Sequence, residues 1–142
     1  MKEKSNNTAK NDIYLKIWEM DQKYMQIRWT ITTFFMSVSF AILGFSLKAD
    51  KVLVPLFVQQ IAALAIYWFA YFLNLRFYDY TDFLRTYLLE LEKSKQTTID
   101  LQSNTQKFMK KRGKPSTTQL LLYFGILYTV GVIVIWIFFP QA

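Results

Sequence analysis

The chain of 142 residues contains no cysteine and no histidine. Disulfide bonds, thiolate or imidazole metal ligands, cysteine nucleophiles and histidine-based proton transfer are therefore excluded. The sequence also lacks a glycine-rich phosphate loop. Asp79 and Asp82 come closest to a pair of catalytic carboxylates. Arg76 and Arg85 lie three residues to either side, however, which is the spacing of surface ion pairs on a helix. We therefore expect no enzymatic activity, no cofactor and no metal.

Three long stretches, residues 29–47, 52–73 and 118–139, lack every charged side chain. A helix needs about 20 residues, at roughly 1.5 Å each, to cross the hydrocarbon core of a bilayer. Buried helices of a soluble bundle would be shorter and would keep a polar face. The sequence therefore predicts an all-α integral membrane protein with three transmembrane helices.

The positive charges are distributed unevenly between the segments that connect these stretches. All but two of the 17 lysines and arginines lie in residues 1–28 or 74–117. Cytoplasmic loops of membrane proteins carry the excess of positive charge, so we expect both segments to be cytoplasmic. The turn at 48–51 and the tail at 140–142 would then be extracytoplasmic. The expected location is a cell membrane, in a bacterium the inner membrane, with several crossings.

Apolar residues continue beyond the first two spans at alternating intervals of three and four, which is the period of one helical face. No proline occurs in residues 11–47, and neither glycine nor proline occurs in 62–92. We therefore expect residues 10–93 to form one long antiparallel helical hairpin that extends into the cytoplasm. Its expected cytoplasmic interface consists of Ile13, Ile17, Met20, Tyr24, Ile27, Leu73, Phe77, Tyr80, Leu84 and Tyr87.

In the expected register, Ile27 lies opposite Leu73 and Tyr24 lies opposite Phe77. The cytoplasmic part of each helix would have 19 residues and a length of about 28 Å at roughly 1.5 Å per residue. The alternative is two separate helices that lie flat on the membrane surface. That arrangement favours a polar face dominated by cations, whereas acidic and basic residues are mixed here.

The remaining cytoplasmic residues are polar. Residues 1–9 are expected to be disordered, and 94–117 to form a connector with a short helix between Thr98 and Gly113. This connector carries a basic cluster of Lys107, Lys110, Lys111, Arg112 and Lys114. Such a cluster either contacts anionic lipid or only orients the third span. Nucleic acid is not expected as a partner, because no recognisable binding module accompanies the charges.

The first span carries hydroxyl side chains on two opposite helical faces. One face holds Thr30, Thr33 and Ser37 with Ala41 and Gly44, and the other holds Thr32, Ser39 and Ser46. Small and hydroxyl residues allow helices in lipid to approach closely and to form hydrogen bonds. The first span is therefore expected to pack on two sides, unless one face lines a water-filled path. Gln59 and Gln60 in the second span are candidates for either role.

Together these patterns predict a small, non-enzymatic, multi-pass membrane protein. Three spans alone do not enclose a pore, and the first span has a second packing face that is available to another copy. The first hypothesis is therefore a homo-oligomeric membrane effector or channel-like protein whose cytoplasmic helices sense a signal or bind a partner. The alternative is a scaffold or accessory subunit that docks a cytoplasmic or membrane protein.

Overall fold

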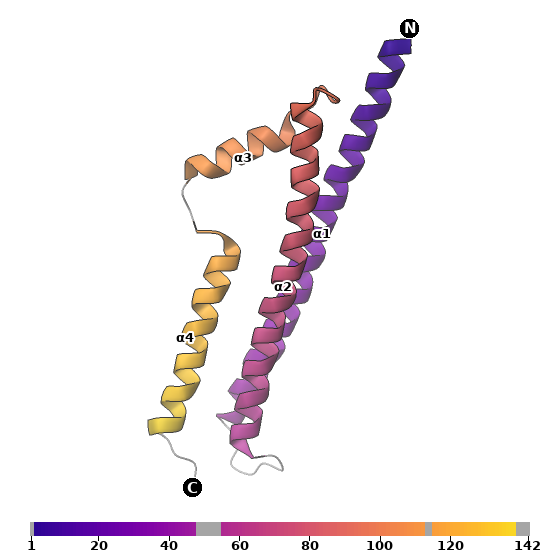
Figure 1. Ribbon diagram of the computed structural model, residues 1–142. Coiled ribbons are helices and arrows are strands. Elements are labelled where there is room, and N and C mark those ends of the chain that lie inside the picture. The colour runs from indigo at the N-terminus through magenta and orange to yellow at the C-terminus, as the bar shows by residue number, and fades with distance from the viewer. Residues whose placement is uncertain (1, 48–54, 113–114, 139–142) are drawn as a thin grey trace. The chain divides into compact units, whose positions relative to one another are not determined.

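The computed structural model describes residues 2–47, 55–112 and 115–138, and within residues 2–7 only the backbone. The predicted turn at 48–51 and tail at 140–142 lie outside these ranges. The described residues are all-helical, as the sequence predicts. Their helices are α1 (Lys2–Ser46), α2 (Leu56–Lys93), α3 (Leu101–Arg112) and α4 (Thr117–Phe138) (Figure 1).

Three of these helices are long and apolar enough to cross a membrane. The candidate spans lie in α1, α2 and α4, the same three regions that the sequence singles out. Helix α4 has 22 residues, which gives a length of about 33 Å at roughly 1.5 Å per residue. That length matches the hydrocarbon thickness of about 30 Å without a long extension at either end.

Helix α1 begins at Lys2, so residues 2–9 are helical and not the disordered tail expected from their composition. No glycine or proline occurs before Gly44 in α1, so no residue in the first part of the helix breaks it. The N-terminal part of α1 is therefore a polar stretch of helix that has no apolar face of its own.

The chain divides into two compact units, and α1 and α2 each contribute to both. Unit 1 comprises residues 1–28 and 76–114, and unit 2 comprises 29–75 and 115–142. In each unit a part of α1 lies beside a part of α2 (Figure 1).

Unit 1 buries a row of polar residues between α1 and α2. On α1 the buried side chains are Tyr14, Asp21 and Arg28, spaced seven residues apart. Seven-residue spacing keeps side chains on the seam between two packed helices. The contacts on α1 and α2 follow each other in opposite order along the chain: Asp21 pairs with Arg85, whereas Arg28 lies over the ring of Tyr78.

The residues that pack in unit 1 differ from the predicted stripe. Leu84 is buried, and Ile17, Tyr24 and Phe77 are half-buried, as is Leu73, which belongs to unit 2. Five further members of the stripe are exposed, namely Ile13, Met20, Ile27, Tyr80 and Tyr87. The register also differs, because the ring of Tyr24 lies 4.7 Å from that of Tyr80 and was expected opposite Phe77.

The packed face of α1 is rotated by one residue from the predicted stripe. Tyr14, Asp21 and Arg28 each follow directly after a predicted interface residue, which is about 100° around a helix. Polar side chains occupy the seam because they find specific partners on α2, and a hydrophobic pattern does not reveal such partners.

Unit 2 packs α4 against α1 and α2 through aromatic rings and hydroxyl groups. The Ser39 hydroxyl donates to the Ala63 carbonyl at 2.7 Å and lies 3.1 Å from the Tyr128 hydroxyl. The Tyr67 hydroxyl donates to the Leu121 carbonyl of α4 at 2.8 Å. Such hydrogen bonds across helices are the contacts expected where lipid offers no hydrophobic driving force.

Helix α2 ends in a tight turn that leads the chain into α3. The amide of Lys95 donates to the Glu92 carbonyl and that of Gln96 to the Leu91 carbonyl, both at 3.1 Å. Lys95 has a φ of 53°, in the left-handed region. This hydrogen-bond pattern is the Schellman motif that ends many helices. The short helix within residues 94–117 is α3, and it begins at Leu101.

Candidate functional site

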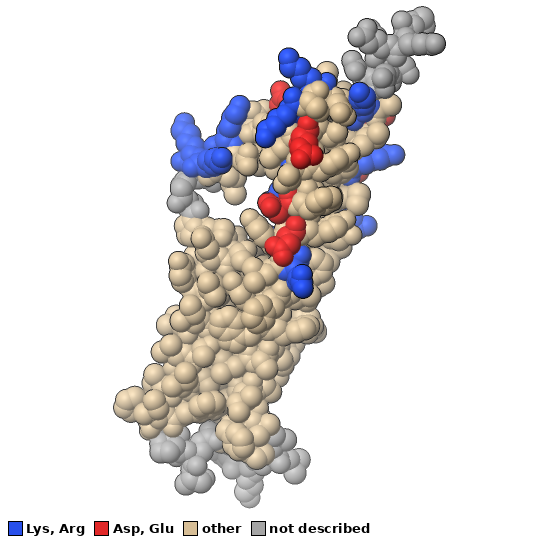
Figure 2. Space-filling view, viewed as in Figure 1, with Lys and Arg blue, Asp and Glu red and all other residues tan. Residues whose placement is uncertain are grey.

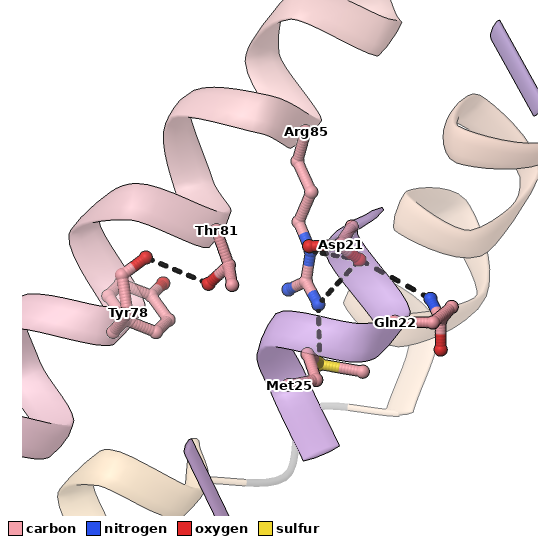
Figure 3. A network of polar contacts seen from close by, with 6 residues as sticks. All are labelled: Asp21, Gln22, Met25, Tyr78, Thr81 and Arg85. Atoms are coloured by element: carbon pink, nitrogen blue, oxygen red, sulfur yellow. Dashed lines mark hydrogen bonds and ion pairs between the residues drawn. The ribbon is translucent and has the colours of Figure 1, made fainter. Parts of the chain in front are cut away.

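Asp21 and Arg85 form an ion pair inside unit 1 (Figure 3). Arg85 Nε lies 3.1 Å from Asp21 Oδ1, and Arg85 Nη2 lies 3.3 Å from Oδ2. The same Nη2 lies 2.8 Å from the sulfur of Met25. Asp21 is only 1% exposed, so its carboxylate has lost nearly all contact with solvent. The bidentate guanidinium is the partner that best replaces this lost hydration.

A second guanidinium, that of Arg28, is buried close to this pair. It is 7% exposed and lies 5.8 Å from the ring centroid of Tyr78. Burial, and then the charge of Arg85, lower the pKa of Arg28. Burial also raises the pKa of Asp21, although Arg85 and Arg28 oppose this. Desolvation is thus the largest influence on the pKa of both groups. One carboxylate, that of Asp21, lies near two guanidinium groups.

A carboxylate at the other end of unit 1 caps helix α3. Glu92 Oε1 accepts the amide of Gln102 at 2.7 Å, and Glu92 Oε2 accepts the amide of Ser103 at 2.9 Å. The hydroxyls of Tyr14 and Ser103 also donate to this carboxylate. The first amides of a helix have no partner within the helix, and they attract a negative charge. Glu92 therefore joins α1, α2 and the first turn of α3.

The pKa directions follow from these contacts. Burial alone would raise the pKa of Glu92, but the hydrogen bonds from Ser103, Tyr14 and the two amides together lower it. Burial and the bond to Glu92 raise the pKa of the Tyr14 hydroxyl well above its usual value. Tyr14 is thus a neutral donor and Glu92 a charged acceptor across the physiological pH range.

Asn11 fixes the turn between α2 and α3 onto α1. Asn11 Oδ1 accepts the Thr97 hydroxyl at 2.9 Å and the Thr98 amide at 3.2 Å. Asn11 Nδ2 donates to the Thr98 hydroxyl at 3.0 Å. Thr98, where the short helix was expected to begin, is held by Asn11, and Glu92 caps α3 instead.

Glu92→Gln should release the first turn of α3, because it removes the charge that four donors share. Hydrogen bonds to a charged group are each worth about 1.5–3 kcal/mol. We expect the amides of Gln102 and Ser103 to exchange hydrogen faster. The increase in rate should correspond to the loss of at least one such hydrogen bond. In the parent protein, protonation of Glu92 at low pH should weaken the same hydrogen bonds. The pKa of Glu92 is lower in the fold than its usual 4.5, so its stabilisation is present above that value and is lost below it.

The matched control for this prediction is Glu90→Gln, since Glu90 lies two residues before Glu92, about 160° away around α2, and is exposed. Exchange rates are corrected for their intrinsic pH dependence. If the Gln102 amide exchanges at the same rate in Glu92→Gln as in Glu90→Gln, the Glu92 carboxylate does not hold α3.

The structure separates the two hydroxyl faces of the first span. Ser39 and Ser46 are buried, and Thr32 Oγ1 accepts a hydrogen bond from Asn74 Nδ2 at 3.0 Å. Thr33 and Ser37, by contrast, are exposed and donate to carbonyls of their own helix at 2.8 Å. We call the exposed set the outer hydroxyl face: Thr30, Thr33, Ser37, Ala41 and Gly44, all of them exposed.

The two glutamines of the second span have different surroundings. Gln60 is fully buried, and its Oε1 accepts the indole N–H of Trp136 on α4. Its Nε2 has no hydrogen-bond partner among the described residues. Gln59 is half-buried. Within one chain, Gln60 therefore packs between α2 and α4. No pattern in the sequence indicates Trp136 as its partner.

In the basic cluster, Lys107, Lys110 and Lys111 are exposed on α3. The side chain of Arg112 and all of Lys114 lie outside the described residues. No group of three or more Asp or Glu side chains suited to a metal ion occurs in the described part of the chain. No known protein family, curated protein or solved structure matches this sequence or fold.

Proposed function

We propose that this chain is a non-enzymatic membrane protein that crosses the bilayer three times and assembles with copies of itself as a membrane effector or channel-like protein. The described residues of unit 2 include no Asp, Glu, Lys or Arg, whereas unit 1 carries both signs of charge (Figure 2). This division supports unit 2 in lipid and unit 1 in water. The excess of cations in unit 1 supports a cytoplasmic N-terminus.

In this proposal α1 and α2 form an antiparallel hairpin that starts in the membrane and continues into the cytoplasm as unit 1. The opposite order of the pairs Asp21–Arg85 and Thr32–Asn74 supports the antiparallel course. The buried ion pair would hold the two helices in one register, a role that single buried polar groups have in coiled coils.

The outer hydroxyl face is the observation on which self-assembly rests. Its opposite face is already filled by Asn74, Ala63 and Tyr128 of the same chain. A Cβ added at Gly44 would meet nothing within 4 Å, so a second helix has room to approach there. Faces of small and hydroxyl residues are the usual contact between helices in lipid. Helices from several copies, joined through this face, would surround a space that one chain does not enclose.

Ser37→Leu tests this assembly. The larger side chain should separate neighbouring copies, because it fills the centre of the outer hydroxyl face while it touches no residue that packs inside the chain. We expect the oligomer seen by mass photometry in lipid nanodiscs or mild detergent to shift towards single chains. Ala65→Leu is the matched control, since Ala65 is an exposed small residue on α2 between the large side chains of Ile61 and Phe69. An unchanged oligomer in Ser37→Leu contradicts the proposal.

A second candidate function, a scaffold for another protein, is supported by the apolar residues that unit 1 leaves exposed. Ile13, Met20 and Ile27 lie along α1 at intervals of seven residues and are all exposed. The contact between the rings of Tyr24 and Tyr80 joins this row to α2. Exposed apolar rows of this kind are typical of surfaces that bind a partner helix.

Purification from the native membrane in mild detergent separates the two candidates. A foreign chain in fixed ratio, lost in Met20→Asp, supports the scaffold. A homo-oligomer that makes liposomes permeable and is unaffected by Met20→Asp supports the effector.

A further inference from the structure

Helices α1 and α2 of unit 1 each carry two rows of side chains, and the rows differ by one residue. The first row lies between the two helices, where Asp21 pairs with Arg85 and Tyr14 donates to Glu92. Figure 3 shows the side chains of Asp21 and Arg85 pointing toward each other. Because this row carries both signs of charge, we call it the polar row. Its members are Tyr14, Trp18, Asp21, Met25 and Arg28 on α1, and Tyr78, Thr81, Arg85, Leu88 and Glu92 on α2.

The second row precedes the polar row by one residue at every position, and we call it the apolar row. Its members are Ile13, Ile17, Met20, Tyr24 and Ile27 on α1, and Phe77, Tyr80, Leu84, Tyr87 and Leu91 on α2. Ile13 is 52% exposed and Met20 43%, whereas Asp21 of the polar row is 1% exposed. This burial is the reverse of the usual one, in which charged side chains remain in water and large apolar ones are covered. The two helices therefore have a second surface suited to packing.

The apolar rows of α1 and α2 lie on the same side of the helix pair. The evidence is the contact between Tyr24 and Tyr80, one residue from each helix, whose ring centroids are 4.7 Å apart. A turn of each helix by one residue, about 100°, would bring Met20 to the place that Asp21 occupies. In an antiparallel pair, equal turns of each helix about its own direction are opposite in sense when seen from one end. Such helices roll over each other, and neither has to slide along its partner.

We infer that unit 1 has a second packing, in which α1 and α2 have each rolled by one residue, so that the apolar row lies between the helices and the polar row faces water. The Asp21–Arg85 ion pair holds the first packing, because a buried charge is costly once it loses its partner. The roll exchanges this pairing for the burial of apolar side chains. The inference rests on the antiparallel course in the proposed function, and it supplies two states between which a signal to the cytoplasmic helices would select.

The roll also separates α1 from the turn between α2 and α3. Asn11 lies three residues before Tyr14, in line with the polar row, and its Oδ1 accepts the Thr97 hydroxyl and the Thr98 amide. In the second packing α1 has turned Asn11 away, so the Thr98 amide loses its acceptor. Asn11 and Asp21 are about 15 Å apart along α1, at roughly 1.5 Å per residue. A change at Asp21 therefore reaches Thr98 only if α1 moves as one body.

The test measures how fast single cysteines react with a water-soluble maleimide, in the full chain reconstituted in lipid nanodiscs. The chain has no native cysteine. Met20→Cys reports on the apolar row and Thr81→Cys on the polar row, since Met20 is exposed and Thr81 is fully buried. Thr86→Cys is the matched control, because it is exposed and lies about 140° from Thr81 and about 120° from Tyr80 around α2.

In the parent chain we expect Met20→Cys to react and Thr81→Cys to be protected. Asp21→Asn removes the carboxylate beside Arg85 and should shift the ratio of the two packings by at least about 100-fold, the factor that corresponds to an unpaired buried charge. Thr81→Cys should then react faster and Met20→Cys more slowly, while Thr86→Cys keeps its rate. The amide of residue 98 should exchange hydrogen faster, and circular dichroism should show that the helices are retained.

Opposite changes at the two cysteines distinguish a roll from a loosening of unit 1, which makes both react faster. Faster reaction at both positions, or no change at either, overturns the inference. Protection of Met20→Cys in the parent shows that another chain covers the apolar row, and it overturns the inference as well. If Asp21→Asn loses its helical signal, the double variant Asp21→Asn, Arg85→Gln replaces it and is expected to give the same opposite changes.

The pair Trp18→Cys and Leu88→Cys separates this inference from the proposed antiparallel course. Trp18 lies four residues after Tyr14 and Leu88 four residues before Glu92, the partner of Tyr14, so a short bifunctional thiol reagent should join the two cysteines in the parent. If no crosslink forms, the antiparallel hairpin and the roll are both overturned. If the crosslink forms but the rates at 20 and 81 do not change in opposite directions, only the roll is overturned.

Discussion

Asp21→Asn is expected to destabilise unit 1 by about 3–5 kcal/mol, the usual cost of leaving a buried charge without its partner. The substitution removes the carboxylate that pairs with Arg85 and also attracts Arg28. Burial and the charge of Arg85 already lower the pKa of Arg28, and the charge of Asp21 opposes this, so the loss of that charge leaves two guanidiniums that repel each other. Urea or thermal unfolding of the purified chain, followed by circular dichroism, measures the effect.

Arg85→Met should cost less than Asp21→Asn, although each removes one side of the same ion pair. Without Arg85, the carboxylate of Asp21 still has the attraction of Arg28. Arg85 itself is also about one third exposed, at 30%, whereas Asp21 is at 1%. An equal loss in the two variants would show that the interaction with Arg28 contributes nothing.

Replacing all three charges should restore stability. Burial opposes the charged form of Asp21 even in the presence of both arginines, and buried ion pairs replaced by apolar residues are often as stable as the original or more so, by about 1–4 kcal/mol. The variant Asp21→Leu, Arg28→Met, Arg85→Met is therefore expected to be at least as stable as the parent. It should also lose the fixed register of α1 on α2, which disulfide crosslinking between introduced cysteines would detect.

The apolar blocks of the sequence were sufficient to predict three of the four helices and the all-α class. A run of about 20 residues without charge has few alternatives, because length and composition both limit it. The short helix α3 was also predictable in outline from its polar composition and from the glycine and proline that follow it. Its cap was not, since Glu92 lies ten residues before the first amide that it accepts.

The packing face of α1 could not be found from hydrophobicity. Ile13 and Met20 belong to the apolar pattern but are exposed, whereas Tyr14 and Asp21 are buried and bind partners on α2. One further pattern was visible in the sequence: Tyr14, Asp21 and Arg28 repeat at seven residues, as Thr32, Ser39 and Ser46 do. Both triplets are buried. A search for a seven-residue period in polar side chains, in addition to apolar ones, would have indicated this face.

Gly125→Ala should destabilise unit 2, although alanine is the better helix former. A Cβ at residue 125 would lie 2.6 Å from Tyr67 Cε1 and 3.5 Å from the ring of Trp68. The ring of Tyr67 has little freedom to move, because it is fully buried and its hydroxyl is bound to the Leu121 carbonyl. Overpacking of this kind costs about 1–3 kcal/mol. That exceeds the gain of up to about 1 kcal/mol from replacing glycine in a helix.

Gly131→Ala, in the same helix, is the matched control and should be neutral or slightly stabilising. A Cβ there would meet nothing within 4 Å, so only the gain in helix propensity remains. Thermal unfolding in detergent, read from tryptophan fluorescence, to which Trp68 and Trp136 of unit 2 contribute, compares the two variants. Gly125→Leu should enlarge the effect and separate α4 from α2, since its side chain requires the space that Tyr67 now occupies. Equal stability of the alanine variants at 125 and 131 would show that α4 does not pack on Tyr67 as the structure has it.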